Sequence, residues 1–416
     1  MKTRLLLGVL MALAALLAPP WVRAQAPIDP STWIEIQVTS DTATQYDSAI
    51  SGDRVAWTDY RNGDADVYVM DLATGAEQKV PGGTANQASG DIDGTIVVYT
   101  DNRAGNSDIY AYDLSTGVET QITTNPADQF SPAISGNRVV WVDLRNGSFD
   151  IYAGTVDGSE SERAVTTAAN VQRSPRISGA IVVWEDYRNG NADVYAYDLV
   201  ANRETPVALG PAYAGYPDVD HNLIVFHENR AAGNWDIYLY DLAMGTETRL
   251  TTDPFQQQFP RIYGSLVVWE DFRNQSGDLY GYDLSTRTEI VIANGSSNQW
   301  DAAVDGLSVA FTDYRNGNLD VYVKRPPAGQ RALEALDLLA ALVVSFNLEQ
   351  GISNSLDTKL TNIQEALNAA NAGQRQDAAN LLQAFINSVE AQRGKQLTSA
   401  QADELIALAR RILGLL

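Results

Sequence analysis

The stretch DLRNGSFDIY at residues 143–152 places two carboxylates, Asp143 and Asp150, around Arg145 and an Asn-Gly turn. Taken alone, paired acids beside a cation resemble the groups used in proton transfer, metal binding or sugar recognition. The pattern, however, occurs seven times along the chain. Its arginines are Arg61, Arg103, Arg145, Arg188, Arg230, Arg273 and Arg315, which gives a period of 42 or 43 residues. Such a period is typical of a repeat architecture.

Each repeat contains the signals of four short strands. NRVVWVD (137–143) is rich in β-branched and aromatic residues and is apolar on both faces, which favours a sheet packed between two neighbouring sheets. The Asn-Gly turn that follows it is a strong hairpin signal, because both turn positions favour positive φ. Four strands in about 40 residues, repeated seven times, predict a mainly β fold, a seven-bladed β-propeller over residues 33–325.

The two ends of the repeat region predict how the ring closes. The seventh repeat ends at DVYVKRP (320–326), after its third strand. The missing strand is found at the other end, where WIEIQVTSDTATQYDSA (33–49) aligns with VETQITTNPADQFSPA (118–133) of the second repeat. We therefore expect an N-terminal strand to complete the last blade, which removes the exposed edges of an open array.

Residues that recur in every blade are expected to serve the fold. A guanidinium group can bridge a carboxylate and backbone carbonyls while its stem packs on an aromatic ring. We expect each repeat arginine to pair with an aspartate of its own or the adjacent blade. The set is represented by Asp59, Arg61 and Asp66, by Asp143, Arg145 and Asp150, and by Asp313, Arg315 and Asp320. The acidic stretches NGDAD and DIDG leave weak calcium binding as an alternative, although they lack the spacing of a dedicated calcium loop. No other cofactor or metal is expected.

A ligand site is expected where the blades differ. The residue just before each first strand is Ala49, Asp91, Ala133, Arg176, Asp218, Arg261 or Ala303, and this column is predicted to surround the mouth of the central channel. Aromatic residues upstream of it add surfaces for stacking on a sugar or anchoring a partner. The predicted ligand-binding residues are Tyr46, Asp91, Arg176, Asp218, Arg261 and Trp300. The alternative is ordinary loop variation over the channel lip.

The fifth repeat departs most from the pattern. Its hairpin VFHENRAAGNWD is lengthened and carries His227 and Glu228, while His221 lies in a preceding turn. With only two histidines in the chain, a multi-histidine metal site is not expected, and a Ser-His-Asp triad needs one of these two. The chain also has no Gly-x-Ser-x-Gly elbow. We expect a non-enzymatic protein, with a propeller lyase or hydrolase acting on acidic glycans as the alternative.

The repeats resemble those of the TolB-type, WD40-like (PD40) propeller family. The matching features are the strand that runs into Asp-x-Arg-Asn-Gly and the next strand that opens with Asp-Ile-Tyr, over residues 33–325. The resemblance implies the propeller fold. Its functions are diverse, because such propellers serve as envelope scaffolds, peptidase gates and polysaccharide lyases.

The N-terminus and the charge indicate the compartment and exclude some partners. Residues 1–24 have two early cations, an apolar run and small residues before Ala24, as in a cleaved signal peptide. The chain has no cysteine, and no later apolar run is long enough to span a membrane. Residues 25–330 carry 19 Lys and Arg against 43 Asp and Glu, so nucleic acid and anionic lipid are disfavoured. We expect a secreted, periplasmic or cell-surface protein whose partner is an extracytoplasmic protein or glycan.

The hydrophobic period changes to about 3.6 residues after a Pro/Gly linker at 326–331. Residues 332–416 contain four amphipathic segments, which predict a small helical bundle with its apolar stripes facing inward. Thr398 and Gln401 match a capping box. This tail resembles the FIMAH-type helical module of secreted prokaryotic proteins, through SFNLEQGISNSLDTKL (345–360) and AFINSVEAQRGKQLTSAQADELIALA (384–409).

Overall fold

The computed structural model describes residues 28–83, 85–231, 233–346, 348–369 and 372–416. The predicted signal peptide at 1–24 lies outside these residues. Asp29–Arg325 form one compact unit, and Pro326–Leu416 belong to a second.

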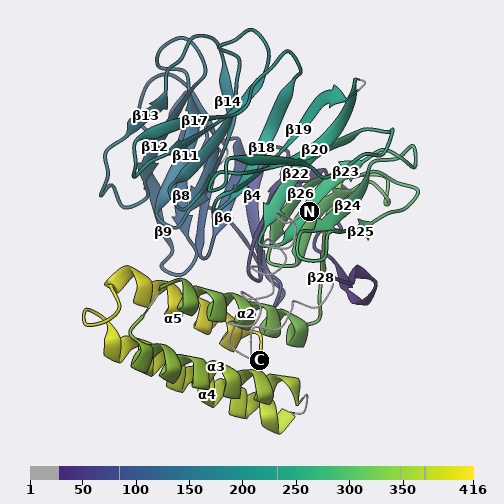
Figure 1. Ribbon diagram of the computed structural model, residues 1–416. Coiled ribbons are helices and arrows are strands. Elements are labelled where there is room, and N and C mark those ends of the chain that lie inside the picture. The colour runs from purple at the N-terminus through teal and green to yellow at the C-terminus, as the bar shows by residue number, and fades with distance from the viewer. Residues whose placement is uncertain (1–27, 84, 232, 347, 370–371) are drawn as a thin grey trace, which may run out of the picture. The chain divides into compact units, whose positions relative to one another are not determined.

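The first unit is a seven-bladed β-propeller, as predicted. It contains seven four-stranded antiparallel sheets whose first strands lie near the centre of the ring and whose fourth strands lie at its periphery (Figure 1). Blades 1 to 3 consist of β2 (Gln45–Ser51), β3 (Arg54–Asp59), β4 (Asp66–Asp71) and β5 (Ala76–Lys79); β6 (Gln87–Asp93), β7 (Ile96–Asp101), β8 (Asp108–Asp113) and β9 (Val118–Gln121); and β10 (Gln129–Ser135), β11 (Arg138–Asp143), β12 (Asp150–Thr155) and β13 (Arg163–Thr166). Blades 4 to 6 consist of β14 (Gln172–Ser178), β15 (Ile181–Asp186), β16 (Asp193–Asp198) and β17 (Arg203–Ala208); β18 (Ala214–Asp220), β19 (Leu223–Ala231), β20 (Asn234–Asp241) and β21 (Thr246–Arg249); and β22 (Gln257–Tyr263), β23 (Leu266–Asp271), β24 (Asp278–Asp283) and β25 (Thr288–Ala293).

Blade 7 joins the two ends of the propeller. It consists of β26 (Gln299–Asp305), β27 (Ser308–Asp313), β28 (Asp320–Arg325) and the N-terminal strand β1 (Ile34–Gln37), which follows the short 3-10 helix η1 (Pro30–Thr32). β1 runs antiparallel to β28, with Ile34 opposite Arg325 and Gln37 opposite Tyr322. The predicted closure by an N-terminal strand is therefore confirmed.

The second strand of each blade is buried on both faces. In β11, Trp141 is fully buried, its ring is stacked with that of Tyr152, and its indole N–H donates to Asp143 Oδ2 at 3.1 Å. Trp, Tyr or Phe occupies the same position in all seven blades and is fully buried in each. Rings of this size bury enough apolar area to hold neighbouring sheets together without disulfides.

The repeated arginine connects three elements of its own blade. Arg145 donates to Asp143 Oδ2 at 2.6 Å and to Oε2 of Glu162, the residue directly before β13, at 2.7 Å, and its guanidinium lies 4.2 Å from the centre of the Tyr152 ring. The second aspartate of the motif, Asp150, instead accepts from the side chain of Asn146. In every blade the repeat arginine forms an ion pair with a glutamate in the fourth strand or directly before it, and these arginines are Arg61, Arg103, Arg145, Arg188, Arg230, Arg273 and Arg315. The motif thus joins the hairpin to the outermost strand of each sheet.

The second unit contains four helices: α2 (Ala328–Ser345), α3 (Gln350–Asn368), α4 (Ala372–Gln392) and α5 (Ser399–Gly414). All four contribute to one core, represented by Leu339, Leu360, Phe385 and Leu405. The capping box is confirmed, because the Thr398 hydroxyl accepts from the Gln401 N–H at 3.2 Å and the Gln401 side chain accepts from the Thr398 N–H at 3.0 Å.

The start of α2 differs from the expected boundary. The linker was expected at 326–331 and the bundle from 332, but α2 begins at Ala328, directly after Pro327. Proline is tolerated where a helix begins, because the first N–H groups have no partner within the helix, so the two prolines mark its start instead of a longer linker. Among the described residues, no helix is long and apolar enough to cross a membrane.

Candidate functional site

A cavity of about 220 Å³ lies where the first strands of all seven blades meet. Four of the predicted ligand-binding residues line it together: Asp91 of β6, Arg176 of β14, Asp218 of β18 and Arg261 of β22. They come from separate blades and are brought together only by closure of the ring. At these four positions the structure therefore agrees with the prediction that the variable residues of the first strands surround the channel.

A β-bulge in each first strand decides which other residues enter the channel. In β2, Tyr46 pairs with Thr58 but Ala49 pairs with Ala56, so one extra residue is accommodated between them. The residue after Tyr46, Asp47, has φ of 58°, in the left-handed region, and lines the cavity. Asp301 of β26 has φ of 52° and also lines it. Bulges of this kind reorient side chains next to functional sites.

Tyr46 and Trp300 do not line the channel, so this part of the prediction is wrong. Tyr46 stacks on Tyr60 of the following hairpin, with ring centres 6.0 Å apart and hydroxyls 3.2 Å apart. The indole of Trp300 lies over Gly277 of blade 6, where a Cβ atom would come within 3.0 Å of it. The bulge turns each of these aromatic residues towards the hairpins and the next residue, Asp47 or Asp301, into the channel. The acidic residue following an aromatic residue in both QYD and QWD was the signal available in the sequence.

Asp91 and Asp218 connect neighbouring blades. The Asp91 carboxylate accepts from the backbone N–H of Ile134 in blade 3 at 3.1 Å, and the Asp218 carboxylate accepts from that of Ile262 in blade 6 at 2.9 Å. Both therefore connect adjacent first strands, and both line the cavity.

The two arginines are the cations of the channel. Arg176 Nη1 donates to Pro175 O at 3.2 Å, and Arg261 Nη1 donates to Pro260 O at 3.0 Å. Within the part of the chain that the structure describes, neither guanidinium forms an ion pair with a carboxylate. Their blades, 4 and 6, flank Asp218 of blade 5, whereas Asp301, Asp47 and Asp91 occupy the consecutive blades 7, 1 and 2. The channel thus has a side with both cations and a side with anions only.

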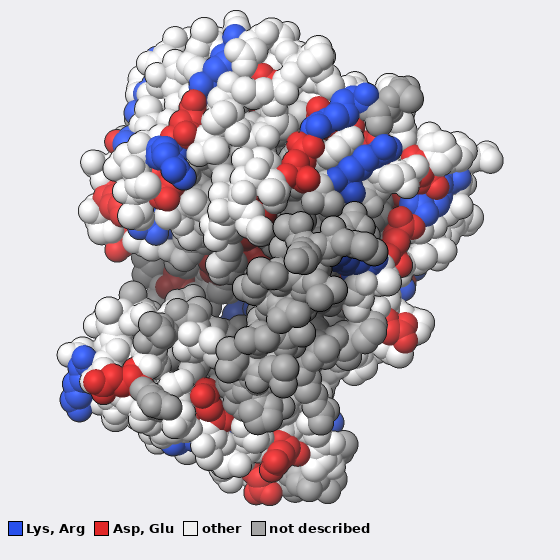
Figure 2. Space-filling model, viewed as in Figure 1, with Lys and Arg blue, Asp and Glu red and all other residues white. Residues whose placement is uncertain are grey.

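The surroundings of the channel shift the pKa values of its charged side chains. Desolvation by the enclosing channel walls raises the pKa of Asp47 to about 6, with a further increase from Asp301, and it also raises the pKa of Asp91 to about 6. The charge of Arg176 opposes both shifts. Burial and the nearby Arg176 lower the pKa of Arg261. On the outer face of the propeller in view, by contrast, acidic and basic side chains lie side by side (Figure 2).

The two histidines have different environments. His227 is 2 % exposed, its Nδ1 accepts from the Phe259 N–H at 3.3 Å, and the rings of Trp235 and Tyr216 pack against it. Burial lowers the pKa of His227 to about 3, so the ring is neutral at physiological pH. His221 is exposed and lies 2.8 Å from Asp220. In the lengthened hairpin, Glu228 takes the place of the repeat aspartate and pairs with Arg230.

Metal-ligand geometry is not found in the described part of the chain, where no three His, Cys, Asp or Glu side chains form a group that would hold a metal ion. The channel carboxylates come from separate blades.

One protein-family model matches part of the repeat region. Residues 48–180 match the TolB beta propeller domain family (PD40), which agrees with the resemblance of the repeats. The match does not extend to the C-terminal helices, so the resemblance to the FIMAH-type module stays a prediction. No curated protein matches the chain.

Comparison with solved structures shows the fold in proteins of different activity. An oligogalacturonate lyase in complex with manganese matches with a TM-score of 0.57 and 14% identity, over 70% of this chain and 93% of the lyase. The propeller domain of the Trilobed protease from Pyrococcus furiosus matches with a TM-score of 0.55 and 16% identity, over 68% of this chain and 96% of the domain. An acylaminoacyl peptidase from Pyrococcus horikoshii matches with a TM-score of 0.53 and 14% identity, over 68% of this chain and 52% of the peptidase. The Pyrococcus furiosus domain has an open velcro topology, whereas β1 closes the ring here.

Proposed function

We propose that this TolB-type propeller protein is a non-enzymatic binding protein of an extracytoplasmic compartment, and that its ligand is a protein segment held at the channel mouth. The observation that carries the proposal is the arrangement of charge in the channel. Arg176 and Arg261 have no carboxylate ion-pair partner among the described residues, and Asp47 and Asp301 line the same cavity from the bulges of their strands.

The separation of charge points to the chemistry of the ligand. An acidic glycan would interact favourably with the two arginines but would be repelled by Asp47, Asp91 and Asp301. A polypeptide segment that carries both acidic and basic side chains satisfies both sides of the channel.

The test is a binding assay of the full-length protein against synthetic peptides that are acidic, basic or of mixed charge. We expect the mixed-charge peptides to bind best. We expect the R176A/R261A and D47N/D301N double variants each to weaken binding by about 10-fold or more, since close charge pairs in a confined site contribute several kcal/mol. The variants R203A and D64N, at sites outside the channel, are the matched controls. Preference for purely acidic peptides that D47N/D301N leaves unchanged would refute the proposal.

The pH dependence of binding provides a second readout. Because desolvation by the channel walls raises the pKa of Asp47 and of Asp91 to about 6, the acidic side of the channel loses charge as the pH falls from about 8 to about 5. Binding of mixed-charge peptides should weaken over this range, whereas the arginines stay charged.

A lyase or hydrolase acting on acidic glycans is the second candidate. It is favoured by the combination of Arg176 and Arg261, which would neutralise a uronate carboxylate, with Asp47, whose pKa of about 6 suits a general base. Incubation with hexagalacturonate and detection of unsaturated or shortened products distinguishes this activity from binding alone. Turnover that is lost in D47N and in R176A would favour the enzyme.

A further inference from the structure

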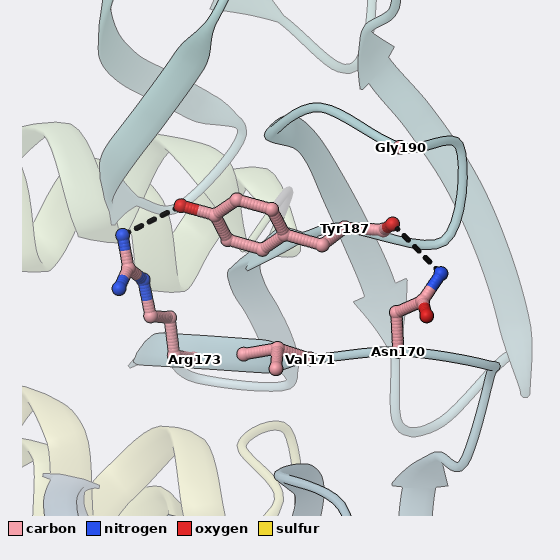
Figure 3. A pocket seen from close by; sticks show the side chains of 5 residues that line it. All are labelled: Asn170, Val171, Arg173, Tyr187 and Gly190. Atoms are coloured by element: carbon pink, nitrogen blue, oxygen red, sulfur yellow. Dashed lines mark hydrogen bonds between the residues drawn. The ribbon is translucent and has the colours of Figure 1, made fainter.

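A second cavity, of about 420 Å³, opens beside the hairpin of blade 4. It is lined by Asn170, Val171, Arg173, Tyr187 and Gly190 (Figure 3). Its volume lies within the roughly 300–1,000 Å³ that is usual for small-molecule sites. None of these residues lines the channel, although Tyr187 and Gly190 belong to the blade 4 copy of the repeated hairpin.

Arg173 is held in place by a buried carboxylate. Its Nε and Nη2 donate to Glu185 Oε1 at 3.2 and 2.9 Å, and the Glu185 side chain is fully buried. Nη2 also lies 2.6 Å from the Tyr187 hydroxyl and 3.0 Å from the Tyr213 hydroxyl. The guanidinium is therefore fixed in orientation, and its charge is balanced within the protein.

This network distinguishes blade 4 from the others. The residue at the position of Arg173 is Tyr46, Ala88, Phe130, Gly215, Gln258 or Trp300 in the other blades. The residue at the position of Glu185 is Thr58, Thr100, Val142, His227, Glu270 or Thr312. Because only blade 4 has both partners, the repeat fold does not require the pair, and the network is a local feature.

The groups left available in the cavity have complementary properties. Within the described residues, Arg173 Nη1 makes no hydrogen bond, and the Asn170 Oδ1 likewise accepts none. The Asn170 Nδ2 donates to the Tyr187 carbonyl at 3.2 Å, which orients the carboxamide at the opposite end of the tyrosine from Arg173 (Figure 3). The Tyr187 ring and the Val171 side chain lie between these two ends. The cavity thus offers a donor, an acceptor and an apolar surface between them.

This combination matches a sugar ring. Hydroxyl groups at the edge of the ring pair with fixed donors and acceptors, and its C–H face packs on an aromatic or aliphatic surface. The absence of net charge at the Arg173–Glu185 pair favours a neutral sugar over a uronate. The excess of 43 Asp and Glu over 19 Lys and Arg in residues 25–330 also disfavours a polyanionic glycan.

We propose that the cavity beside blade 4 binds neutral sugar residues of a glycan. The site is independent of the channel, and neither requires the other to be occupied. A protein that held a polypeptide in its channel and a glycan at blade 4 would be attached to two kinds of component at once.

The test uses the full-length protein and saturation-transfer NMR with cellohexaose, mannohexaose and xylohexaose as neutral probes and hexagalacturonate as the acidic probe. We expect at least one neutral probe to bind. Asn170 has φ of 69°, so N170G removes the carboxamide without backbone strain, and it should weaken binding by about 5-fold, the usual effect of one hydrogen bond. R173Q/E185Q removes both charges together and should abolish binding without leaving a buried ion unpaired.

Controls separate this proposal from that for the channel. Y314A alters the same hairpin position in blade 7, where the side chain is 50% exposed, and should leave sugar binding unchanged. R176A/R261A and D47N/D301N should also leave it unchanged. Three results would overturn the proposal: failure of all three neutral probes to bind, a preference for hexagalacturonate, or binding by N170G and R173Q/E185Q that equals binding by the unaltered protein.

Discussion

At the scale of single residues, the repeated arginine motif shows how a cluster of charges that resembles an active site serves the fold. Asp143 is fully buried, and three donors approach its carboxylate: the Trp141 indole, the Arg145 backbone and the Arg145 guanidinium. A buried carboxylate requires such donors, because its desolvation costs several kcal/mol. Each blade contains this arrangement because each blade has a buried carboxylate at the same hairpin that needs hydrogen-bond donors.

Replacing Arg145 by alanine tests this role. R145A leaves Asp143 buried with two hydrogen bonds but no cation, and removes the contact with the Tyr152 ring. We expect the free energy of unfolding to fall by about 2–4 kcal/mol, measured by urea denaturation. The control E162A breaks only the outer, partly exposed pair and should cost less than about 1 kcal/mol. Equal stability of R145A and the unaltered protein would contradict the structural role.

Glu270 provides a prediction on pH. It is 5% exposed, it accepts from the Asp301 N–H at 3.0 Å, and burial raises its pKa from 4.5 to about 7. Between these values the folded protein binds more protons than the unfolded chain, so Glu270 lowers stability as the pH rises through this window.

The variant E270Q removes this titration and keeps an acceptor for the Asp301 N–H. At about pH 8 it should be more stable than the unaltered protein by about 1–3 kcal/mol, because each pKa unit corresponds to about 1.4 kcal/mol. Near pH 4.5 the two should differ little. Urea denaturation at both pH values is the measurement, with E289Q on the outer strand of the same blade as control. If E270Q gave no gain at high pH, burial of this carboxylate would not be the cause of the shift.

The channel residues show where sequence reasoning succeeded and where it could not. Asp91, Arg176, Asp218 and Arg261 could be found, because comparing equivalent positions of seven repeats isolates the ones that vary. Asp47 and its counterpart in blade 7, Asp301, were missed because the aromatic residue before each was expected to face the channel. The bulge, with left-handed backbone at Asp47 and Asp301, turns the acidic residue inward instead, and the acid that follows the aromatic residue in QYD and QWD was its sign in the sequence. The pocket of blade 4 was missed for another reason, since Arg173 and Glu185 meet across two strands.

At the scale of elements, the N-terminal strand has the role that a fourth strand has in the other blades. Glu35 of β1 pairs with Arg315, as Glu77 of β5 pairs with Arg61. Both this ion pair and the strand pairing could be predicted from the repeat alignment, because the sequence of β1 aligns with those of the other fourth strands. The start of α2 was less well predicted, since two prolines are compatible with either a linker or the first turn of a helix.

Val38, directly after β1, tests the importance of closure. It is 6% exposed, its N–H donates to Val321 O at 2.8 Å, and it packs with Val55 and Trp57 of blade 1. V38D introduces a charge into this cluster and should lower the free energy of unfolding by about 3–5 kcal/mol. It should also expose blade 7 to limited proteolysis. I34D, at a position of β1 that is 46% exposed, should cost less than about 1 kcal/mol and leave the protease resistance unchanged.

At the scale of the whole molecule, the sevenfold repeat provides a rigid frame on which differences between blades become sites. Blades 4 to 6 carry both channel arginines, Asp218, the cavity proposed for sugar and the buried histidine, whereas blades 7, 1 and 2 contribute only aspartates among the charged groups that line the bulge end of the channel. The binding surfaces therefore break the symmetry of a fold that is itself nearly symmetric. The repeated residues therefore stabilise the fold, and the residues that vary between blades form the sites. Asp91 and Asp218 have both roles, because they line the channel and also connect neighbouring blades.

The two compact units give the last prediction. Each has its own hydrophobic core, the propeller between its sheets and the helices around Leu339, Phe385 and Leu405. A unit with its own core is able to fold alone, so residues 28–325 and 326–416 should each fold as separate fragments. Circular dichroism should show a β spectrum for the first and a cooperatively melting helical spectrum for the second. Because the channel and the blade 4 cavity are built entirely from the propeller, the first fragment should bind mixed-charge peptides and neutral hexasaccharides within about twofold of the full-length protein. Loss of either binding activity in a fragment that retains its β spectrum would show that the helices contribute to that site.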